Sequence, residues 1–182
     1  MKKIPLILSA LVLGALIYSF APAANSENGE IVNEPGGVEW VDWTTAVERN
    51  KTDKKAFLVD VYTYWCGWCK RMDKTTFMDP KVVKYVNENF HAIKLNAEQK
   101  ESINFNGHEF KWVEGGRNGV HTLAYSLMDG RMSYPTIVYL NSNVERIMIS
   151  PGFKQADGIM KELVFAAEDH YKTTTWDEFQ KK

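Results

Sequence analysis

The sequence predicts a single mixed α/β domain, in which a central mixed β-sheet is flanked by helices. Three observations lead to this expectation. Short apolar runs rich in β-branched residues, typical of buried strands, recur along the chain. Segments with apolar residues at helical spacing alternate with them. The length of 182 residues suits one domain plus a targeting segment, and a hydrophobic content of 45% is enough for a core.

The N-terminus resembles a secretory signal. A basic start precedes an apolar run over residues 4–20, and Ala-Pro-Ala at 21–23 gives the small-x-small pattern of a signal-peptidase site. We therefore expect residues 1–23 to be a signal peptide. The alternative is an uncleaved N-terminal anchor, since about 17 apolar residues is the lower limit for a membrane span. Either reading places the domain outside the cytoplasm, in the periplasm or an equivalent oxidising compartment.

The remaining chain divides into three parts by composition. Residues 24–37 are rich in Asn, Glu, Gly and Pro and predict a flexible leader. Residues 38–172 are expected to form the folded domain. Residues 173–182 are mostly polar, and we expect them to be a frayed tail.

The domain should begin with a helix and a strand. Thr44 or Thr45 can cap a short helix that ends near Asn50. The near-continuous apolar run at 56–62 (AFLVDVY) predicts a central strand buried on both faces. A second helix should then begin at the two cysteines and continue through Met72.

The middle of the domain combines a third helix, a second strand and an irregular insertion. Asp79-Pro80 resembles an N-cap followed by proline at the first helical position and predicts a helix to about residue 89. Residues 91–95 (HAIKL) predict a second strand. Residues 98–116 are interpreted as an insertion with a hairpin turn at Asn106-Gly107. Its aromatic residues either extend a substrate surface or, as we expect, form a small core of their own: Phe105, Phe110 and Trp112.

The last elements complete the sheet and cover it. A helix is expected over about residues 118–128, ended by an Asp-Gly pair. Residues 136–140 (TIVYL) predict a strand that pairs with a further strand at 146–149. A final helix over about 155–171 carries an apolar stripe at helical spacing.

Charge and cysteine count exclude several classes of function. The formal net charge of −1 gives no basic surface of the kind that nucleic-acid binders use. The only two cysteines, Cys66 and Cys69, belong to one local feature, so the chain lacks the spread-out pairs of a disulfide-stapled scaffold. A zinc site would need two further ligands, and the four histidines are scattered, so we expect no metal. A purely structural disulfide across so small a loop would stabilise little.

Cys66-Gly67-Trp68-Cys69 lies where a predicted strand is followed by a predicted helix. Unpaired backbone N–H groups at a helix N-terminus carry partial positive charge and stabilise a thiolate. Cys66 is thus the expected nucleophile. Cys69, one turn further along, is placed to resolve a mixed disulfide on Cys66. The pattern indicates thiol–disulfide exchange.

Residues 59–70 (VDVYTYWCGWCK) resemble the active-site strand and helix of the thioredoxin family. The Thr-Phe-Met-Asp-Pro segment at 76–80 is similar to an exported thioredoxin-like subfamily that includes the C-terminal domain of the transmembrane thiol:disulfide reductase. The resemblance covers about residues 38–171, apart from the insertion. It implies a thioredoxin fold, with the inserted segment preceding a cis-proline loop.

The resemblance also implies roles for two charged residues. Asp60, six positions before Cys66, matches the family's buried carboxylate below the second cysteine. A buried Asp has a raised pKa and can exchange a proton with Cys69. Lys94 matches the lysine that pairs with this Asp; its alternative role is a solvated residue at a strand end.

Five further residues are expected to contact substrate. Tyr134-Pro135 resembles the cis-proline loop, whose backbone edge can pair with an extended substrate strand. Trp65 and Trp68 are the aromatic residues near the motif expected at the surface. With Gly67 they would complete the substrate surface. The Gly-Trp dipeptide lacks the proline of many thioredoxins and the histidine of strongly oxidising relatives, which favours reduction or general exchange.

The sequence thus predicts a protein disulfide oxidoreductase that needs no bound cofactor. The chain has no flavin or nicotinamide fingerprint, so its partners should be disulfide-containing proteins and an upstream thiol electron donor, such as a membrane reductase. The alternative is a thioredoxin-fold module that binds extended chains while its cysteines stay idle.

Overall fold

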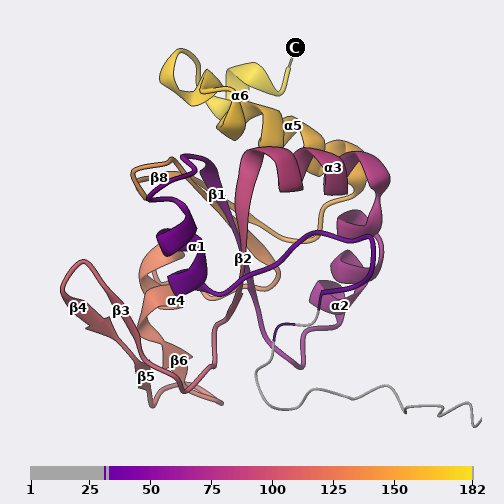
Figure 1. Cartoon of the computed structure of the whole chain (residues 1–182). Helices are drawn as coiled ribbons and strands as arrows, with labels where there is room; N and C mark the ends of the chain where they lie inside the picture. Colours follow the sequence, from indigo (N-terminus) through magenta and orange to yellow (C-terminus); the bar gives the residue numbers. More distant parts are fainter. Residues whose placement is uncertain (1–30, 32, 182) are drawn as a thin grey trace, which may run out of the picture.

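The computed structural model describes residues 31 and 33–181. The predicted signal segment, residues 1–23, therefore lies outside the described residues. At the centre is a four-stranded sheet in the order β2-β1-β7-β8 (Figure 1). Its strands are β1 (Ala56–Tyr62), β2 (Phe90–Asn96), β7 (Thr136–Leu140) and β8 (Arg146–Pro151). β1 runs parallel to β2 and antiparallel to β7, so the predicted mixed sheet is confirmed.

Helices cover both faces of the sheet (Figure 1). On one face lie α1 (Trp43–Arg49) and α4 (Thr122–Leu127), and on the other α2 (Gly67–Lys74), α3 (Pro80–Asn89) and α5 (Ala156–Ala167). Two 3-10 turns, η1 (Thr76–Met78) and η2 (His170–Lys172), follow α2 and α5. Each face of the sheet thus has its own apolar core. Within the described residues, no helix is both long and apolar enough to cross a bilayer.

β1 is buried on both faces, as its apolar run predicts. Side chains alternate along a strand. Phe57 and Val59 therefore pack below α1 and α4, whereas Leu58 packs towards α2 and α3. Asp60 lies on the same face as Leu58, and the parallel register pairs it with Lys94 of β2.

Two helix starts show how local sequence sets the boundaries. α3 begins as predicted, with Pro80 as its first residue and the Asp79 carboxylate accepting the Lys81 and Val82 amides. The predicted cap of α1 is wrong. Asp42, rather than a threonine, accepts the N–H of Thr45 at 2.8 Å. A carboxylate one turn earlier satisfies this free amide, so the helix begins before the threonines.

The leader enters the fold earlier than residue 38. The Asn33 side chain accepts the N–H of Trp40 at 2.7 Å and donates to the Trp40 carbonyl at 3.1 Å. Val41 then bridges to Ile93 of β2. The described part of the leader is thus tied through Asn33 to the backbone next to this bridge.

The insertion contains the predicted hairpin, β3 (Ile103–Phe105) and β4 (His108–Phe110), around Asn106-Gly107. Both turn residues have positive φ, 50° and 75°, as a tight hairpin turn requires. A second ribbon pairs β5 (Trp112–Val113) with β6 (Val120–His121). Residues 98–121 are called the inserted segment below.

The helix predicted over 118–128 starts later than expected. Gly119 has φ +73°, outside the helical region, and Val120 and His121 pair with β5 instead. α4 therefore begins only at Thr122. It stops before Asp129 and Gly130, both at positive φ, as predicted.

The expected separate core of the insertion is wrong. The Phe105 ring meets Trp43 of α1 edge-on at 5.3 Å, and Ile103 is buried in the same cluster. Phe110 packs against that cluster too, whereas Trp112 packs on Gly119. A lone hairpin buries too little apolar area for stability, so the hairpin is anchored on the main core.

The C-terminal segment is more ordered than its composition suggests. α5 ends at Ala167, four residues early, because Asp169 adopts a left-handed conformation. The predicted frayed tail instead contains α6 (Trp176–Phe179), which begins with a capping box. Phe165 of α5 meets the Trp176 and Phe179 rings at 5.4 and 5.2 Å. This aromatic cluster holds the tail in place.

Candidate functional site

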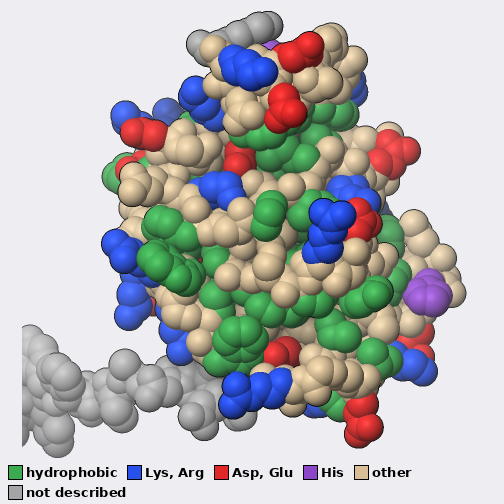
Figure 2. All heavy atoms as spheres, turned by 180° about the vertical axis from the view of Figure 1, so that it is seen from behind, with side chains coloured by type: hydrophobic (Ala, Val, Ile, Leu, Met, Phe, Trp, Pro, Cys, Tyr) green, Lys and Arg blue, Asp and Glu red, His purple; other side chains and the backbone are tan. Residues whose placement is uncertain are grey.

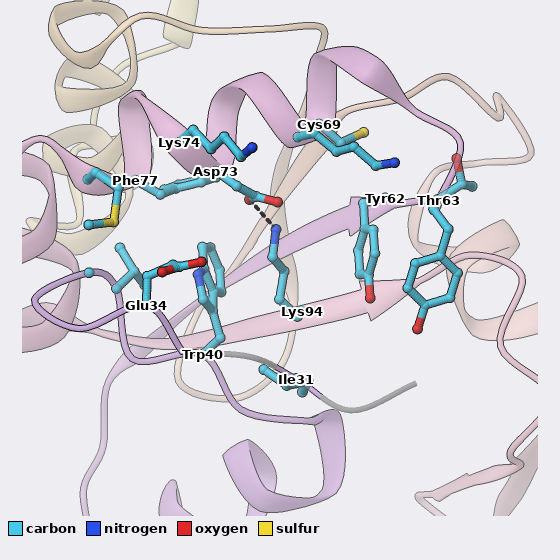
Figure 3. Close-up of a pocket in the computed structure, with 15 residues that line it drawn as sticks. Ile31, Glu34, Trp40, Tyr62, Thr63, Cys69, Asp73, Lys74, Phe77 and Lys94 are labelled. Atoms are coloured by element: carbon cyan, nitrogen blue, oxygen red, sulfur yellow. Dashed lines mark hydrogen bonds and ion pairs between the residues drawn. The ribbon is translucent and has the colours of Figure 1, made fainter. Parts of the chain in front are cut away.

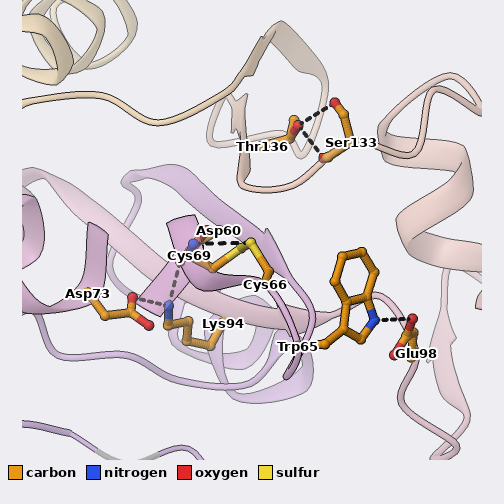
Figure 4. The surroundings of a disulfide bond; sticks show 9 residues. All are labelled: Asp60, Trp65, Cys66, Cys69, Asp73, Lys94, Glu98, Ser133 and Thr136. Atoms are coloured by element: carbon orange, nitrogen blue, oxygen red, sulfur yellow. Dashed lines mark hydrogen bonds and ion pairs between the residues drawn. A yellow bond between two sulfur atoms is a disulfide. The ribbon is translucent and has the colours of Figure 1, made fainter. Parts of the chain in front are cut away.

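The two cysteines lie at the junction of β1 and α2. Cys66 is the N-cap of α2, and its Sγ accepts the backbone N–H of Cys69 at 3.1 Å (Figure 4). The two sulfurs form a disulfide. Both side chains are nearly excluded from water, with 5% of Cys66 and 2% of Cys69 exposed. The predicted helix-start position of the motif is confirmed, and Cys66 sits where free amides stabilise negative charge.

Asp60 and Lys94 form a buried ion pair near the dithiol. Asp60 is 1% exposed, and its Oδ2 lies 2.5 Å from Lys94 Nζ. Burial raises the pKa of Asp60; the charge of Lys94 opposes this rise and that of Asp73 adds to it. The predicted burial of Asp60 and its pairing with Lys94 are confirmed.

Asp73 is a member of this cluster that the sequence analysis missed. Its carboxylate forms a second ion pair with Lys94. Burial alone would lower the pKa of Lys94, but the charges of Asp60 and Asp73 outweigh it and raise the pKa. A signal was available, because Asp73 follows Cys69 by four residues and so lies on the same side of the helix.

A cavity of about 250 Å³ opens between α2, the leader and this cluster (Figure 3). Lys94 points into it, with Trp40 and Tyr62 on either side, 4.8 and 5.0 Å from its ammonium. Cys69 also lines the cavity. Thr63, another lining residue, has a buried Oγ1 without a hydrogen-bond partner among the described residues, as does Asp60 Oδ1. Buried polar atoms of this kind are commonly satisfied by water.

The Tyr134–Pro135 bond is cis, as predicted. The loop is braced on both sides. Thr136 Oγ1 donates to the Ser133 carbonyl at 2.8 Å (Figure 4), and the Gly152 amide donates to the Pro135 carbonyl at 2.8 Å. The Tyr134 ring meets the Trp65 ring edge-on at 5.7 Å, which brings the loop beside the cysteine motif.

Trp65 and Trp68 are exposed, as predicted, at 61% and 54%. Trp65 Nε1 donates to Glu98 at 2.9 Å, on the far side of the disulfide from Lys94 in Figure 4. Trp68 packs against Phe153, and Arg71 lies over both rings. Gly67 is exposed between the cysteines. The view in Figure 2 shows further hydrophobic side chains reaching the surface in patches between charged ones.

The described residues contain no cluster of three His, Cys, Asp or Glu side chains that could hold a metal ion. The site brings together three kinds of group. These are a disulfide at a helix start, a buried acid with a cationic partner, and an aromatic surface around a backbone edge.

Comparison with protein families finds one matching model. Residues 30–163 match the family Thioredox_DsbH, described as a protein of unknown function, DUF255. A 67-residue stretch is 30% identical to an uncharacterized protein of Caenorhabditis elegans and 25% identical to spermatogenesis-associated protein 20 of Mus musculus. That stretch is 36% of this chain but only 9% and 8% of those two proteins, so the chain spans a small part of their length.

Solved structures agree on the fold. A thioredoxin-fold protein from Helicobacter pylori superposes with a TM-score of 0.55 at 22% identity, over 71% of this chain and 80% of the other. The structure of a DsbH oxidoreductase superposes with a TM-score of 0.52 at 14% sequence identity, over 78% of this chain and 94% of the other. A putative disulphide-isomerase from Bacteroides thetaiotaomicron superposes with a TM-score of 0.52 at 25% sequence identity, over 75% of this chain and 98% of the other. The domain has a thioredoxin fold, and its Cys66–Cys69 pair supports a thiol–disulfide oxidoreductase-like role.

Proposed function

Since the chain belongs to the Thioredox_DsbH family and has a thioredoxin fold, we propose that it reduces or exchanges disulfides of exported proteins. The observation that carries this proposal is the hydrogen bond from the Cys69 amide to Cys66 Sγ, 3.1 Å long. A sulfur in that position is stabilised as a thiolate once the disulfide has been reduced. Export is inferred from the signal-like residues 1–23.

The exchange proceeds in two steps. The Cys66 thiolate attacks one sulfur of a substrate disulfide, so that bond breaks and one substrate thiolate leaves and takes up a proton. Cys69, deprotonated in turn, attacks Cys66 Sγ and displaces the second substrate sulfur as a thiolate, which then takes up a proton. Two electrons pass to the substrate, and the Cys66–Cys69 disulfide of the structure is the product state.

Asp60 is the proposed acceptor of the Cys69 proton. It lies buried near the dithiol, and burial raises its pKa towards the range in which a carboxylate can accept and return a proton. The positive charge of Lys94 stabilises the carboxylate form of Asp60 before it accepts that proton. A thiol electron donor is needed to reduce the disulfide for the next cycle, and a membrane reductase is the proposed source.

The substrate chain is proposed to lie across the exposed aromatic surface of Trp65 and Trp68. The backbone N–H and C=O of Tyr134, held beside the motif by the cis bond to Pro135, are the proposed hydrogen-bonding groups for an extended segment. Gly67 leaves the approach to Cys66 free of a side chain, since it is exposed and no atom of another segment approaches its Cβ position.

Reduction of insulin disulfides tests the proposal. Dithiothreitol-reduced wild-type protein should accelerate insulin reduction, and Cys66→Ser should abolish the acceleration. Cys69→Ser should instead accumulate a mixed disulfide on Cys66, because the resolving thiol is missing. If wild type and Cys66→Ser behave alike, the cysteines are idle and the protein is a binding module for extended chains.

A further inference from the structure

A cleft of about 760 Å³ opens beside the dithiol, between the cis-proline loop and the inserted segment. One part of its lining is apolar side chains, namely Trp65, Val120, Tyr125, Met132 and Tyr134. The other part is mainly the loop Gly115–Gly119. Three of the five loop residues are glycine, so main chain forms much of that wall.

The loop that forms this wall is held in one conformation. The Gly119 amide donates to the Gly115 carbonyl at 2.8 Å, and Trp112 Nε1 donates to the Asn118 carbonyl at 3.2 Å. Asn118 Nδ2 in turn donates to Glu98 Oε1 at 3.0 Å. A wall that is already ordered does not have to lose conformational freedom when a guest binds.

Glu98 connects this wall to the cysteine motif. The same Oε1 atom that accepts Asn118 also accepts Trp65 Nε1, at 2.9 Å. The Trp65 ring then meets Tyr134. The cleft is therefore continuous with the backbone edge on which the substrate is proposed to lie. Trp65, the residue before Cys66, lines the cleft and also contacts Tyr134 at that edge.

We propose that this cleft binds a large apolar or aromatic side chain flanking the reactive cysteine of an extended polypeptide substrate. The inference rests on the proposed function and adds a substrate preference to it. Successive residues of an extended chain are about 3.3 Å apart, so a chain paired with the Tyr134 edge places a neighbouring side chain beside the cleft.

An apolar guest fits the chemistry of the lining. Tyr125 is 53% exposed and Trp65 61% exposed, so both rings have apolar surface left to cover. The charged lining residues are Glu98 and Arg117, and Glu98 already accepts two hydrogen bonds. The inserted segment thus acts as a specificity element.

Two disulfide-linked peptides that differ only in carrying Phe or Ser on both sides of the cysteine test the proposal. We measure the second-order rate constant for thiol release by the reduced protein. Wild type should favour the Phe peptide about tenfold, a difference of about 1.4 kcal/mol. In the double variant Val120→Ser, Tyr125→Ser the preference should fall below about twofold. Val113→Ser is the matched control, because Val113 pairs with Val120 in the same ribbon but lies outside the cleft, and it should keep the preference.

A binding measurement on wild type makes the test independent of variant folding. A Phe peptide with Ser in place of its cysteine should shift the NMR signals of the Trp65 indole N–H and the Asn118 side-chain amide, and the Ser peptide should not. Equal rates for both peptides, or no shift, would overturn the cleft proposal and leave the oxidoreductase proposal standing. Absence of thiol release from either peptide would overturn both.

Discussion

Lys94 Nζ lies 2.5 Å from Asp60 Oδ2 in a position almost closed to water, with 10% of the Lys94 side chain and 1% of Asp60 exposed. The two residues are register partners on parallel strands, so the sheet itself brings them together. Charges are rarely buried unless paired, because desolvation of each is costly. Loss of either partner should therefore lower the stability of the fold and change the pKa of the other.

Removing the cation should destabilise the fold in a pH-dependent way. Lys94→Met leaves Asp60 buried without its partner, and breaking a buried pair in this way costs about 3–5 kcal/mol. A carboxyl with a raised folded pKa contributes fully to stability below its unfolded pKa and loses that contribution as the pH rises through the folded pKa. Without Lys94 the folded pKa rises further, so the destabilisation should be larger near pH 8 than near pH 5.

Denaturant unfolding of wild type and Lys94→Met across that pH range measures this difference. Lys94 itself stays charged throughout, since its own pKa is raised above 10.5. Asp73→Asn is the matched control, because its side chain is 35% exposed and its pair with Lys94 is partly solvated; its effect should be smaller. A pH-independent loss in Lys94→Met would contradict the assigned coupling to Asp60.

The reactivity of the cysteines provides a second prediction. In the reduced protein, Cys66 should be alkylated at about pH 6 at least tenfold faster than free cysteine, because the Cys69 amide and the start of α2 stabilise its thiolate. Iodoacetamide labelling followed by mass spectrometry measures the rate. The variant Cys69→Ala retains the donating amide and isolates the Cys66 signal. Labelling at the free-cysteine rate would remove the basis for Cys66 as nucleophile.

Much of the site could be predicted from the sequence because it depends on local order. A strand, a cysteine pair and a helix follow one another within residues 56–74, so Cys66 had to lie at the helix start. Asp60 interrupts an otherwise apolar strand, which marks it as buried. Lys94 required the register of β2 against β1, which came only from the family resemblance.

The parts that were missed depend on contacts between distant segments. Glu98 and Asn118 meet through the fold of the inserted segment, and no spacing rule connects them to Trp65. The late start of α4 follows from the pairing of Val120 and His121 with β5, which overrides their helical pattern. Order in the tail depends on Phe165, on the preceding helix.

Glu162 of α5 provides a third prediction. It is 4% exposed and accepts hydrogen bonds from Tyr139 at 3.0 Å and Ser150 at 2.7 Å. Burial raises its pKa above the ordinary 4.5, although the Ser150 bond, the Lys154 charge and the Tyr139 bond oppose the rise. Its protonated form is thus favoured by folding.

The raised pKa of Glu162 determines how its contribution to stability changes with pH. The contribution of Glu162 is present below its unfolded pKa and lost as the pH rises through the raised folded pKa. The side chain of Glu162→Gln cannot ionise, so this variant does not lose stability in this way. The free energy of unfolding of the variant minus that of wild type should therefore increase as the pH rises from about 4 to 8. Guanidinium unfolding at each pH tests this. Glu88→Gln, at an exposed site on α3, should show no such trend.

A fourth prediction separates backbone strain from steric conflict in the inserted segment. Gly107 and Gly119 have almost the same positive φ, 75° and 73°, so alanine is strained at both. A Cβ at Gly107 would meet nothing within 4 Å, whereas one at Gly119 would lie 2.2 Å from the Trp112 ring. Gly107→Ala should therefore cost about 1–2 kcal/mol, from backbone strain alone.

Gly119→Ala should cost more than that, because the Trp112 ring must move and release its hydrogen bond to Asn118. Thermal unfolding of the two variants measures the difference. The loop Gly115–Gly119 would also lose its ordered shape, so the preference for Phe-flanked peptides should fall in Gly119→Ala and persist in Gly107→Ala. Equal losses of stability in both variants would show that Trp112 does not hold the loop, and the preorganised wall of the cleft would then lack its main support.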